Sequence, residues 1–220
     1  MATRDELLAH LAEVVASVAA THPIRVGIDG PPAAGKTTLA DDLAAVLRAR
    51  GRHVIRAGID DFLFPRAQRY RRGEFSAEAC YYDNHDYAAL NRVLLDPLGP
   101  AGDRSYQTAI YDRSLDGPPP LCVRSAPTDA VLLFDGVFLM RPELIDRWDL
   151  RIFVSVPFDT TVQRALVRER GQLADPDIER RWRERYIPSQ EIYFATVHPL
   201  DHADVIVQNE NLEQPTWRSR

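Results

Sequence analysis

The sequence predicts an α/β fold in which a doubly wound, mainly parallel sheet of five strands carries helices on both faces. Strand-like apolar runs alternate along the chain with segments of helical periodicity, and a glycine-rich loop joins the first run to a helix. The chain has 220 residues, the length of one compact domain. We therefore expect a single domain over residues 1–220, with its core at 22–60 and 128–210 and an insertion at about 61–127.

The expected elements follow from apolar periodicity and from breaker residues. Residues 3–6 have the pattern of a capping box, and the apolar residues behind them recur at helical spacing, so a helix precedes the first strand. The expected strands are residues 24–28, 53–59, 131–134, 150–156 and 203–207. The helices expected after the first strand are residues 38–50, 86–95, 159–170 and 177–196. Two short strand-like pieces, 106–111 and 121–124, lie in Pro- and Gly-rich sequence and predict a small β-hairpin outside the sheet.

Lys36 is the single lysine among 27 basic side chains, so the chain uses arginine wherever a generic positive charge suffices. It lies in Gly-Pro-Pro-Ala-Ala-Gly-Lys-Thr at 30–37, a full match to the phosphate-binding loop G-x-x-x-x-G-K-[ST] between a strand and a helix. Such a loop turns backbone amides and a compact ammonium toward phosphates, and its Ser or Thr hydroxyl can ligate Mg²⁺. The sequence therefore predicts a P-loop NTPase fold. The nucleotide-binding candidates are Gly30, Ala33, Ala34, Gly35, Lys36, Thr37 and Thr38.

Two carboxylates follow strands that are expected to end at the edge of the sheet where the phosphate loop lies. Asp135 suits a magnesium site, and because Gly136 follows it, the second acid that activates water in many ATPases is absent. Asp60 follows the strand at 53–59, where a kinase of alcohols needs a base for the hydroxyl proton. The common guanine-specific switches are excluded, because their N-K-x-D motif needs a second lysine.

The order of these motifs resembles that of the uridine kinase family, which also includes phosphoribulokinase and bacterial pantothenate kinase. The resemblance covers most of the chain. It is carried by the phosphate loop, Asp60-Asp61-Phe62, Tyr82-Asp83, Tyr111-Asp112, Leu133-Phe134-Asp135-Gly136 and the closing strand at 203–207.

The resemblance implies an ATP:alcohol phosphotransferase that uses ATP and Mg²⁺ and has an arginine-bearing helical lid. The implied catalytic residues are Lys36, Asp60 and the lid arginine Arg168. Thr37, Asp135 and Asp60 are the implied metal site. The candidate substrate-binding residues are Asp60, Asp83, which would bind ribose hydroxyls, Tyr111 on the hairpin, His85 beside Asp83, and Arg185 on the helix after the lid.

The first-ranked acceptor is the 5′-hydroxyl of uridine or cytidine, a neutral nucleoside held through vicinal hydroxyls by Asp83. Arg113 and Asp116 stand where uridine kinases read the base, so another small alcohol is the alternative: a sugar, a sugar phosphate or a pantothenate-like compound. The arginines at 66–72 fit either a solvated loop or contacts to an anionic acceptor or to the phosphates of ATP. A nucleotide-binding switch ATPase without an acceptor is a third hypothesis, and the presence of Asp60 favours the kinase.

Composition and charge restrict the classes of partner and the cellular location that we expect. The net charge of −5 argues against a nucleic-acid partner, and no apolar run is long enough for a membrane span. The N-terminal residues are acidic where a signal peptide is basic, so we expect a cytoplasmic protein. Cys80 and Cys122 are expected to be free thiols. A small-molecule partner fits best, and a homo-oligomer remains open.

Replacing Lys36 tests the argument from the lone lysine. Lys36→Ala, and also Lys36→Arg, should lose most turnover and weaken nucleotide binding, because a planar guanidinium does not fit a loop built around a point charge. Steady-state kinetics and a nucleotide titration measure both effects. A Lys36→Arg protein with ordinary kinetics would contradict the argument.

Overall fold

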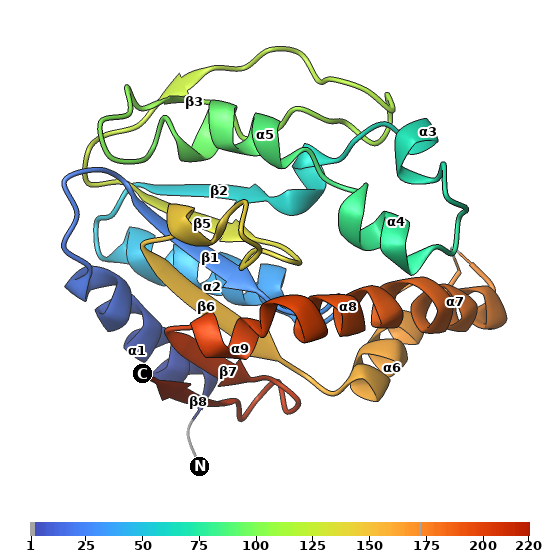
Figure 1. Ribbon diagram of the computed structural model, residues 1–220. Helices are drawn as coiled ribbons and strands as arrows, with labels where there is room; N and C mark the ends of the chain where they lie inside the picture. Colours follow the sequence, from blue (N-terminus) through green and yellow to red (C-terminus); the bar gives the residue numbers. More distant parts are fainter. Residues whose placement is uncertain (1–2, 172) are drawn as a thin grey trace.

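The computed structural model describes residues 3–171 and 173–220 and confirms the α/β class (Figure 1). The main sheet has six strands in the order β2-β5-β1-β6-β7-β8. The strands are β1 (Ile24–Asp29), β2 (Val54–Gly58), β5 (Val131–Asp135), β6 (Leu150–Ser155), β7 (Val205–Gln208) and β8 (Thr216–Ser219). The first five are the predicted parallel strands, and β8 pairs antiparallel with β7. The sixth strand escaped prediction because it is an edge strand with one large apolar residue, Trp217, and a mostly exposed surface.

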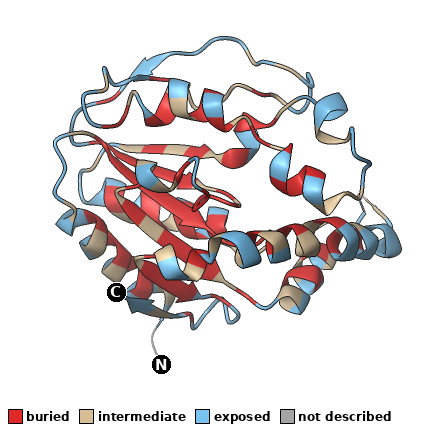
Figure 2. Cartoon of the chain, in the orientation of Figure 1, coloured by how far each residue is buried: buried red, intermediate tan, exposed pale blue. Residues whose placement is uncertain are grey.

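Helices cover both faces of the sheet, as expected. They are α1 (Arg4–Ser17), α2 (Lys36–Ala49), α3 (Arg66–Arg69), α4 (Ala77–Tyr82), α5 (Tyr87–Leu90), α6 (Phe158–Arg168), α7 (Asp175–Arg181), α8 (Ile187–Val197) and α9 (Pro199–His202). On one face α1 and α2 pack over the central strands, and α5 and α8 lie on the other (Figure 1). Figure 2 shows that the central strands are buried between these layers, as parallel sheets usually are.

Two of the three helices predicted after α2 contain π-helical turns. The segment expected at 177–196 consists of α7, a π turn η4 (Trp182–Tyr186) and α8. The segment expected at 86–95 consists of α5 and a second π turn, η2 (Asn91–Leu95). Two 3-10 turns, η1 (Ile59–Phe62) and η3 (Ile145–Arg147), complete the helical elements. Apolar periodicity cannot distinguish a π turn from the surrounding α-helix, because the buried stripe continues through both.

The predicted hairpin outside the sheet is present but much shorter than expected. Its strands β3 (Ser105–Tyr106) and β4 (Arg124–Ser125) pair over two residues each. The rest of the predicted first strand leaves the ladder, and the amides of Ile110 and Tyr111 both donate to the carbonyl oxygen of Asp61. This segment therefore packs beside η1 instead of extending the hairpin.

Other expectations about the chain are confirmed. Thr3 and Glu6 form the capping box that starts α1. Cys80 is a buried free thiol and Cys122 an exposed one. In the described part of the chain, no helix has both the length and the hydropathy required to cross a bilayer.

Parallel pairing brings the carboxyl ends of the central strands to one edge of the sheet. In the register of the sheet, Asp135 at the end of β5 lies beside Ile28 of β1 and beside Gly58 of β2. The loops that leave β1, β2 and β5 therefore converge at this edge, which is where ligands of α/β proteins bind.

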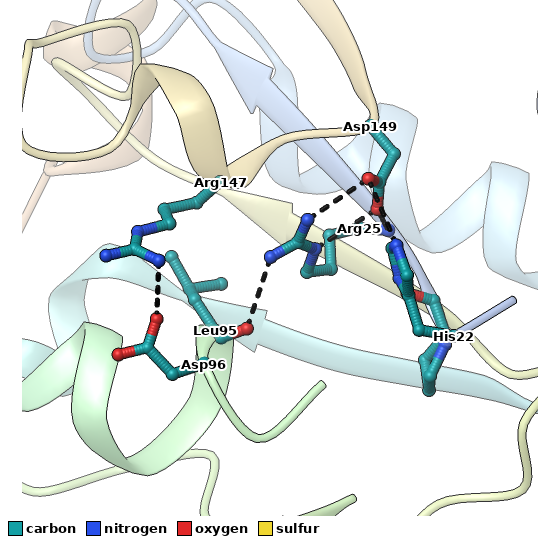
Figure 3. Close-up of polar contacts among 7 residues, drawn as sticks. His22, Arg25, Leu95, Asp96, Arg147 and Asp149 are labelled. Carbon is teal, nitrogen blue, oxygen red and sulfur yellow. Dashed lines mark hydrogen bonds and ion pairs between the residues drawn. The ribbon is translucent and has the colours of Figure 1, made fainter. Parts of the chain in front are cut away.

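A buried ion pair joins β1 to the start of β6 at the opposite edge (Figure 3). The Arg25 guanidinium donates to both carboxylate oxygens of Asp149 at 3.1 Å, and to the carbonyl oxygen of Leu95 at 3.3 Å. Asp149 also accepts the backbone amide of Arg25 at 2.8 Å. Nearby, Arg147 pairs with Asp96 at 2.7 Å on the surface.

The pairs Arg25–Asp149 and Arg147–Asp96 in Figure 3 should differ in their contribution to stability. Asp149→Ala should lower the free energy of unfolding by about 3–5 kcal/mol, because it leaves the buried Arg25 guanidinium without a counter-charge. Arg147→Ala, the matched control at an exposed pair, should change it by less than about 1 kcal/mol. Urea unfolding of both variants measures the difference, and equal losses would show that Arg25 is satisfied by water and backbone.

Candidate active site

The phosphate loop occupies residues 30–35 between β1 and α2, as predicted. Gly35 caps α2 with φ +90°, and a Cβ there would lie 2.7 Å from Asn209 Nδ2. Gly30 has φ +147°, and a Cβ there would collide with the carbonyl oxygen of Val154. Both positions therefore need glycine for conformation and for space.

Two side chains hold this loop from outside. Asn209, which follows β7, donates Nδ2 to the carbonyl oxygen of Ala34 at 2.7 Å. Arg164, on α6, donates to the carbonyl oxygens of Ala33 and Ala34 at 3.3 and 3.4 Å, and to that of Asn209 at 2.6 Å. The loop is thus fixed by contacts from segments far away in the sequence.

Lys36 points across the loop and is buried. Its Nζ donates to the carbonyl oxygen of Pro31 at 2.7 Å. Burial lowers the pKa of Lys36 to about 8, against the opposing effect of the carboxylates of Asp29, Asp135 and Asp60. The phosphates of a nucleotide would supply the negative charge that this buried ammonium lacks.

Asp29, at the end of β1, is a fully buried carboxylate behind the loop. It accepts hydrogen bonds from the Gly30 amide at 2.7 Å, the Leu139 amide at 3.1 Å and the Tyr193 hydroxyl at 2.5 Å. Burial raises the pKa of Asp29 to about 6, although the Tyr193 hydroxyl, the two amides and Lys36 all favour the ionised form.

Thr37 and Asp135 form the oxygen pair expected of a magnesium site. Thr37 Oγ1 donates to Asp135 Oδ2 at 2.5 Å, and Arg56 Nη2 pairs with Asp135 Oδ1 at 2.8 Å. A hydroxyl and a carboxylate beside a phosphate loop suit Mg²⁺, which takes one or two protein oxygens together with phosphate and water. The residues present therefore fit the ion. Arg56 was not among the residues predicted from the sequence, although a charged residue in a half-buried strand could have indicated a site.

Asp60 lies in η1, directly after β2, at the same edge of the sheet. Its Oδ2 pairs with Arg113 Nη2 at 2.8 Å, and both side chains are about two-thirds exposed, at 67% and 66%. An ion pair this exposed is weak and opens readily. Burial raises the pKa of the neighbouring Asp61, and the charge of Asp60 adds to the effect.

Asp83 and Tyr111, the candidates for ribose binding, are engaged with arginines of the segment 66–72. The Asp83 carboxylate accepts from Arg72 Nε at 2.6 Å and from Arg71 Nη2 at 3.3 Å, and only 10% of the side chain is exposed. The Tyr111 hydroxyl donates to Asp116 at 2.7 Å and accepts from Arg69 at 2.9 Å. A ribose would have to replace these partners, so the roles of both residues stay predictions.

A cavity of about 1150 Å³ connects these groups. The candidate residues on its wall are Ala33, Gly35, Lys36, Thr37, Thr38, Asp60, His85, Asp135, Arg168 and Arg185. Gly30, Ala34, Asp83 and Tyr111 are not on its wall. The cavity thus brings together most of the residues that the sequence selected.

His85 and Arg168 line different parts of this cavity. Burial, with the nearby charges of Arg141 and Arg69, lowers the pKa of His85 to about 3, so its imidazole is neutral at physiological pH. Arg168 is exposed at the end of α6, pairs with Glu169 at 2.8 Å and lies close enough to lower the pKa of Lys36. This position suits the predicted lid arginine.

Several wall residues were not selected from the sequence. They are Arg56, Arg69, Tyr70, Asn84, Trp182, Ser189 and Gln190, together with others that contribute mainly bulk. Trp182, an apolar residue, and Gln190, a polar one, fall in the helix expected at 177–196, and only the packing of η4 and α8 places both on the cavity wall. Arg69 offered a signal, because it lies in the basic segment after Asp60.

These features together define a P-loop kinase. A phosphate loop follows β1, acidic side chains follow β2 and β5, and the arginine-bearing helix α6 contacts the loop. The chain belongs to the cytidylate kinase-like family, whose model matches residues 25–211. This family membership confirms the predicted resemblance to uridine kinase-like P-loop kinases.

Two curated relatives are about one-quarter identical to the chain. Uridine-cytidine kinase B of Dictyostelium discoideum is 26% identical over 193 residues, covering 84% of this chain and 74% of the relative. The tRNA-specific adenosine deaminase subunit tad2 of Schizosaccharomyces pombe is 25% identical over 194 residues, covering 86% of this chain. The chain spans only 45% of the length of that second relative.

Solved structures share the fold across nearly the whole chain. A possible uridine kinase from Bacillus stearothermophilus has a TM-score of 0.72 at 24% identity, covering 92% of this chain and 97% of that one. A D-glycerate 3-kinase from Cryptococcus neoformans has a TM-score of 0.68 at 18% identity, covering 97% and 99%. Identities this low establish the common fold alone.

The buried Asp29 carboxyl predicts a pH-dependent cost of its substitution. The pKa of Asp29 is about 6 in the folded chain, against an ordinary value of 3.8. Between these two pH values the folded chain keeps a proton on Asp29 that the unfolded chain releases. Its contribution to stability therefore falls across this window as pH rises, by up to about 1.4 kcal/mol per pH unit. Asp29→Asn removes this pH dependence. The free energy of unfolding of the variant should therefore fall further below that of wild type at pH 4 than at pH 7.

Urea unfolding of wild type and Asp29→Asn between pH 4 and pH 7 measures this deficit. Tyr193→Phe provides a comparison, because losing the hydroxyl donor should raise the pKa of Asp29 and extend the window upward. A deficit that does not vary with pH would show that Asp29 ionises alike in both states.

Proposed function

We propose that this protein transfers the γ-phosphoryl group of ATP to a hydroxyl group of a small molecule. The observation that carries the proposal is the cavity, whose wall holds Lys36, the pair Thr37 and Asp135, and the carboxylate of Asp60. A switch protein needs the first three groups but has no use for a carboxylate on the acceptor side. Asp60 therefore favours a phosphotransferase.

The roles of the residues follow from their positions. The loop amides and Lys36 would bind the β- and γ-phosphates, and Arg168 at the end of α6 would approach the transferring group as the lid closes. Thr37 and Asp135 would hold Mg²⁺, which offsets phosphate charge when bound. Asp60 would accept the proton of the attacking hydroxyl, using Oδ1, the oxygen not engaged by Arg113.

In the transfer step the acceptor oxygen forms a bond to the γ-phosphorus, and the bond from that phosphorus to the β–γ bridging oxygen breaks. The bridging oxygen keeps the electron pair and leaves with ADP. The hydroxyl proton passes to Asp60 and then to solvent.

A nucleoside acceptor is supported by the resemblance to uridine kinases and by the uridine-cytidine kinase relative. The 5′-hydroxyl of uridine or cytidine would then lie at Asp60, with its ribose on Asp83. Such binding requires Asp83 to exchange Arg71 and Arg72 for ribose hydroxyls.

Substitution of Asp60 tests the proposed base. Asp60→Asn should lower turnover about 10²- to 10⁴-fold and leave the binding of MgATP intact, because it removes the proton acceptor without altering the phosphate loop. Acceptor-dependent release of ADP and a nucleotide titration measure the two effects.

Asp61→Asn is the matched control, since Asp61 is the adjacent carboxylate on the same wall. Its effect on turnover should be much smaller. Equal losses, or a greater loss at Asp61, would assign the proton transfer to the neighbouring residue.

A further inference from the structure

Arg185 is a buried cation on the cavity wall, and the described part of the chain gives it no carboxylate partner. It is 3% exposed, and its Nη1 donates to the carbonyl oxygens of Glu74 and Ser76 at 2.9 and 3.2 Å. Among residues 3–171 and 173–220, no carboxylate lies within the 4 Å of an ion pair with it, although this chain pairs most of its partly buried arginines. A buried charge without a counter-charge is costly, unless a ligand supplies one.

Arg69 lies on the same part of the wall. The guanidinium carbons of Arg185 and Arg69 are 4.8 and 5.5 Å from the centre of the Tyr70 ring, so the two cations flank one aromatic side chain. Arg69 donates to the carbonyl oxygen of Phe64 and to the Tyr111 hydroxyl, both neutral groups. In the described chain it too has no carboxylate within ion-pair distance.

Buried polar groups without partners accompany these arginines on the wall. The Gln190 side chain is 1% exposed, and neither its Nε2 nor its Oε1 has a hydrogen-bond partner within the part of the chain that is described. The same holds for Trp182 Nε1, three residues before Arg185 in the π turn η4. Buried amide and indole groups are rarely left unpaired in proteins, so these donors indicate a bound ligand.

Arg185 and Arg69 lie on the acceptor side of the cavity, whereas Trp182 packs against α6 and against Ala33 of the phosphate loop. Arg185 contacts the backbone just before α4, and α4 packs against α8 (Figure 1). Arg69, Arg113 and Arg185 are all near enough to His85 to lower its pKa, whereas Arg168 is the arginine that affects Lys36. The nucleotide phosphates therefore account for Lys36 and Arg168, and they leave Arg185 and Arg69 for the acceptor.

We propose, on the basis of the phosphotransferase function above, that the acceptor is an anionic alcohol whose carboxylate or phosphate group is bound by Arg185 and Arg69. Gln190 Nε2 donates a hydrogen bond beside this anion. The hydroxyl of the same molecule is directed to Asp60, where the transfer step described above takes place. Neutral nucleosides lack the anion and are poor acceptors.

Matched pairs of acceptors test the charge requirement. Release of ADP by the full chain is compared for D-glycerate and glycerol, for fructose 6-phosphate and fructose, and for uridine and cytidine. In at least one pair the charged member should have a kcat/KM at least about tenfold above that of its neutral partner, the worth of a charge-assisted hydrogen bond. The pair that responds distinguishes a carboxylate from a phosphate.

Variants locate the anion site. Arg185→Met, which keeps the length of the side chain and removes its charge, should raise the KM of the charged acceptor by roughly 30-fold or more and leave the KM of ATP unchanged. Arg185→Lys should recover part of the loss. Arg183→Met is the control, because Arg183 is an exposed arginine of the same π turn and does not line the cavity.

A binding measurement separates this proposal from the proposed function. With the phosphate loop saturated by MgADP, D-glycerate and fructose 6-phosphate are compared for their effect on the thermal unfolding of wild type and Arg185→Met. Stabilisation of wild type alone supports the anion site even if no acceptor turns over, and in that case the phosphotransferase proposal fails.

Three results would overturn the anion site. They are equal turnover of charged and neutral partners, an equal loss on both in Arg185→Met, and no stabilisation of wild type by either anion. Turnover of uridine or cytidine above all charged acceptors would restore the nucleoside as the acceptor.

Discussion

The buried carboxylate of Asp29 joins three segments that meet behind the phosphate loop. It accepts the amide that starts the loop, an amide of the segment after β5, and the hydroxyl of Tyr193 on α8. Tyr193 in turn accepts the amide of Met140. The loop, the carboxyl edge of the sheet and α8 therefore keep one relative position, and the cavity between them depends on it.

The second constraint is the distribution of charge in the cavity. Its wall carries Lys36 and seven arginines against four carboxylates. Three of these carboxylates, Asp60, Asp135 and Glu169, already hold an arginine each. Arg181 pairs with Glu74, which is not on the wall, and the cations that remain in the described chain are Lys36 and Arg164 at the phosphate loop and Arg69 and Arg185 beside Tyr70. This charge distribution is the basis for proposing two anionic ligands, a nucleotide and an anionic acceptor.

The proposed acceptor side lies where the insertion meets the C-terminal helices. The segment leading into α4 supplies the carbonyl oxygens that hold Arg185, and η4 supplies Arg185 itself. The π turn η4 contributes Trp182, Arg185 and Tyr186 to the same wall, a use of π turns that is common at functional sites. If α6 and α7 move as a lid, the movement would also displace Arg185, because η4 continues directly from α7.

Local sequence determined the parts of this protein that depend on neighbours in the chain. The capping box of α1, the phosphate loop, the five parallel strands and the positions of Asp60 and Asp135 could all be predicted, because each follows from a short pattern and from the rule that parallel strands end at one edge. The strand β8 and the brevity of the hairpin could not, because an edge strand needs no apolar pattern and a ladder stops where a competing partner, here the Asp61 carbonyl, takes its amides.

Only the tertiary structure decided how the arginines are used. Arg185 and the arginines at 66–72 were candidates for substrate contacts and Arg56 was not, but no local pattern shows which of them would find a carboxylate. Folding pairs Arg56 with Asp135 and Arg72 with Asp83, but within the described residues it leaves Arg69 and Arg185 on the cavity wall without a carboxylate. Whether a charge is satisfied depends on which distant groups come within a few ångströms of it, and no periodicity or motif of the chain carries that information.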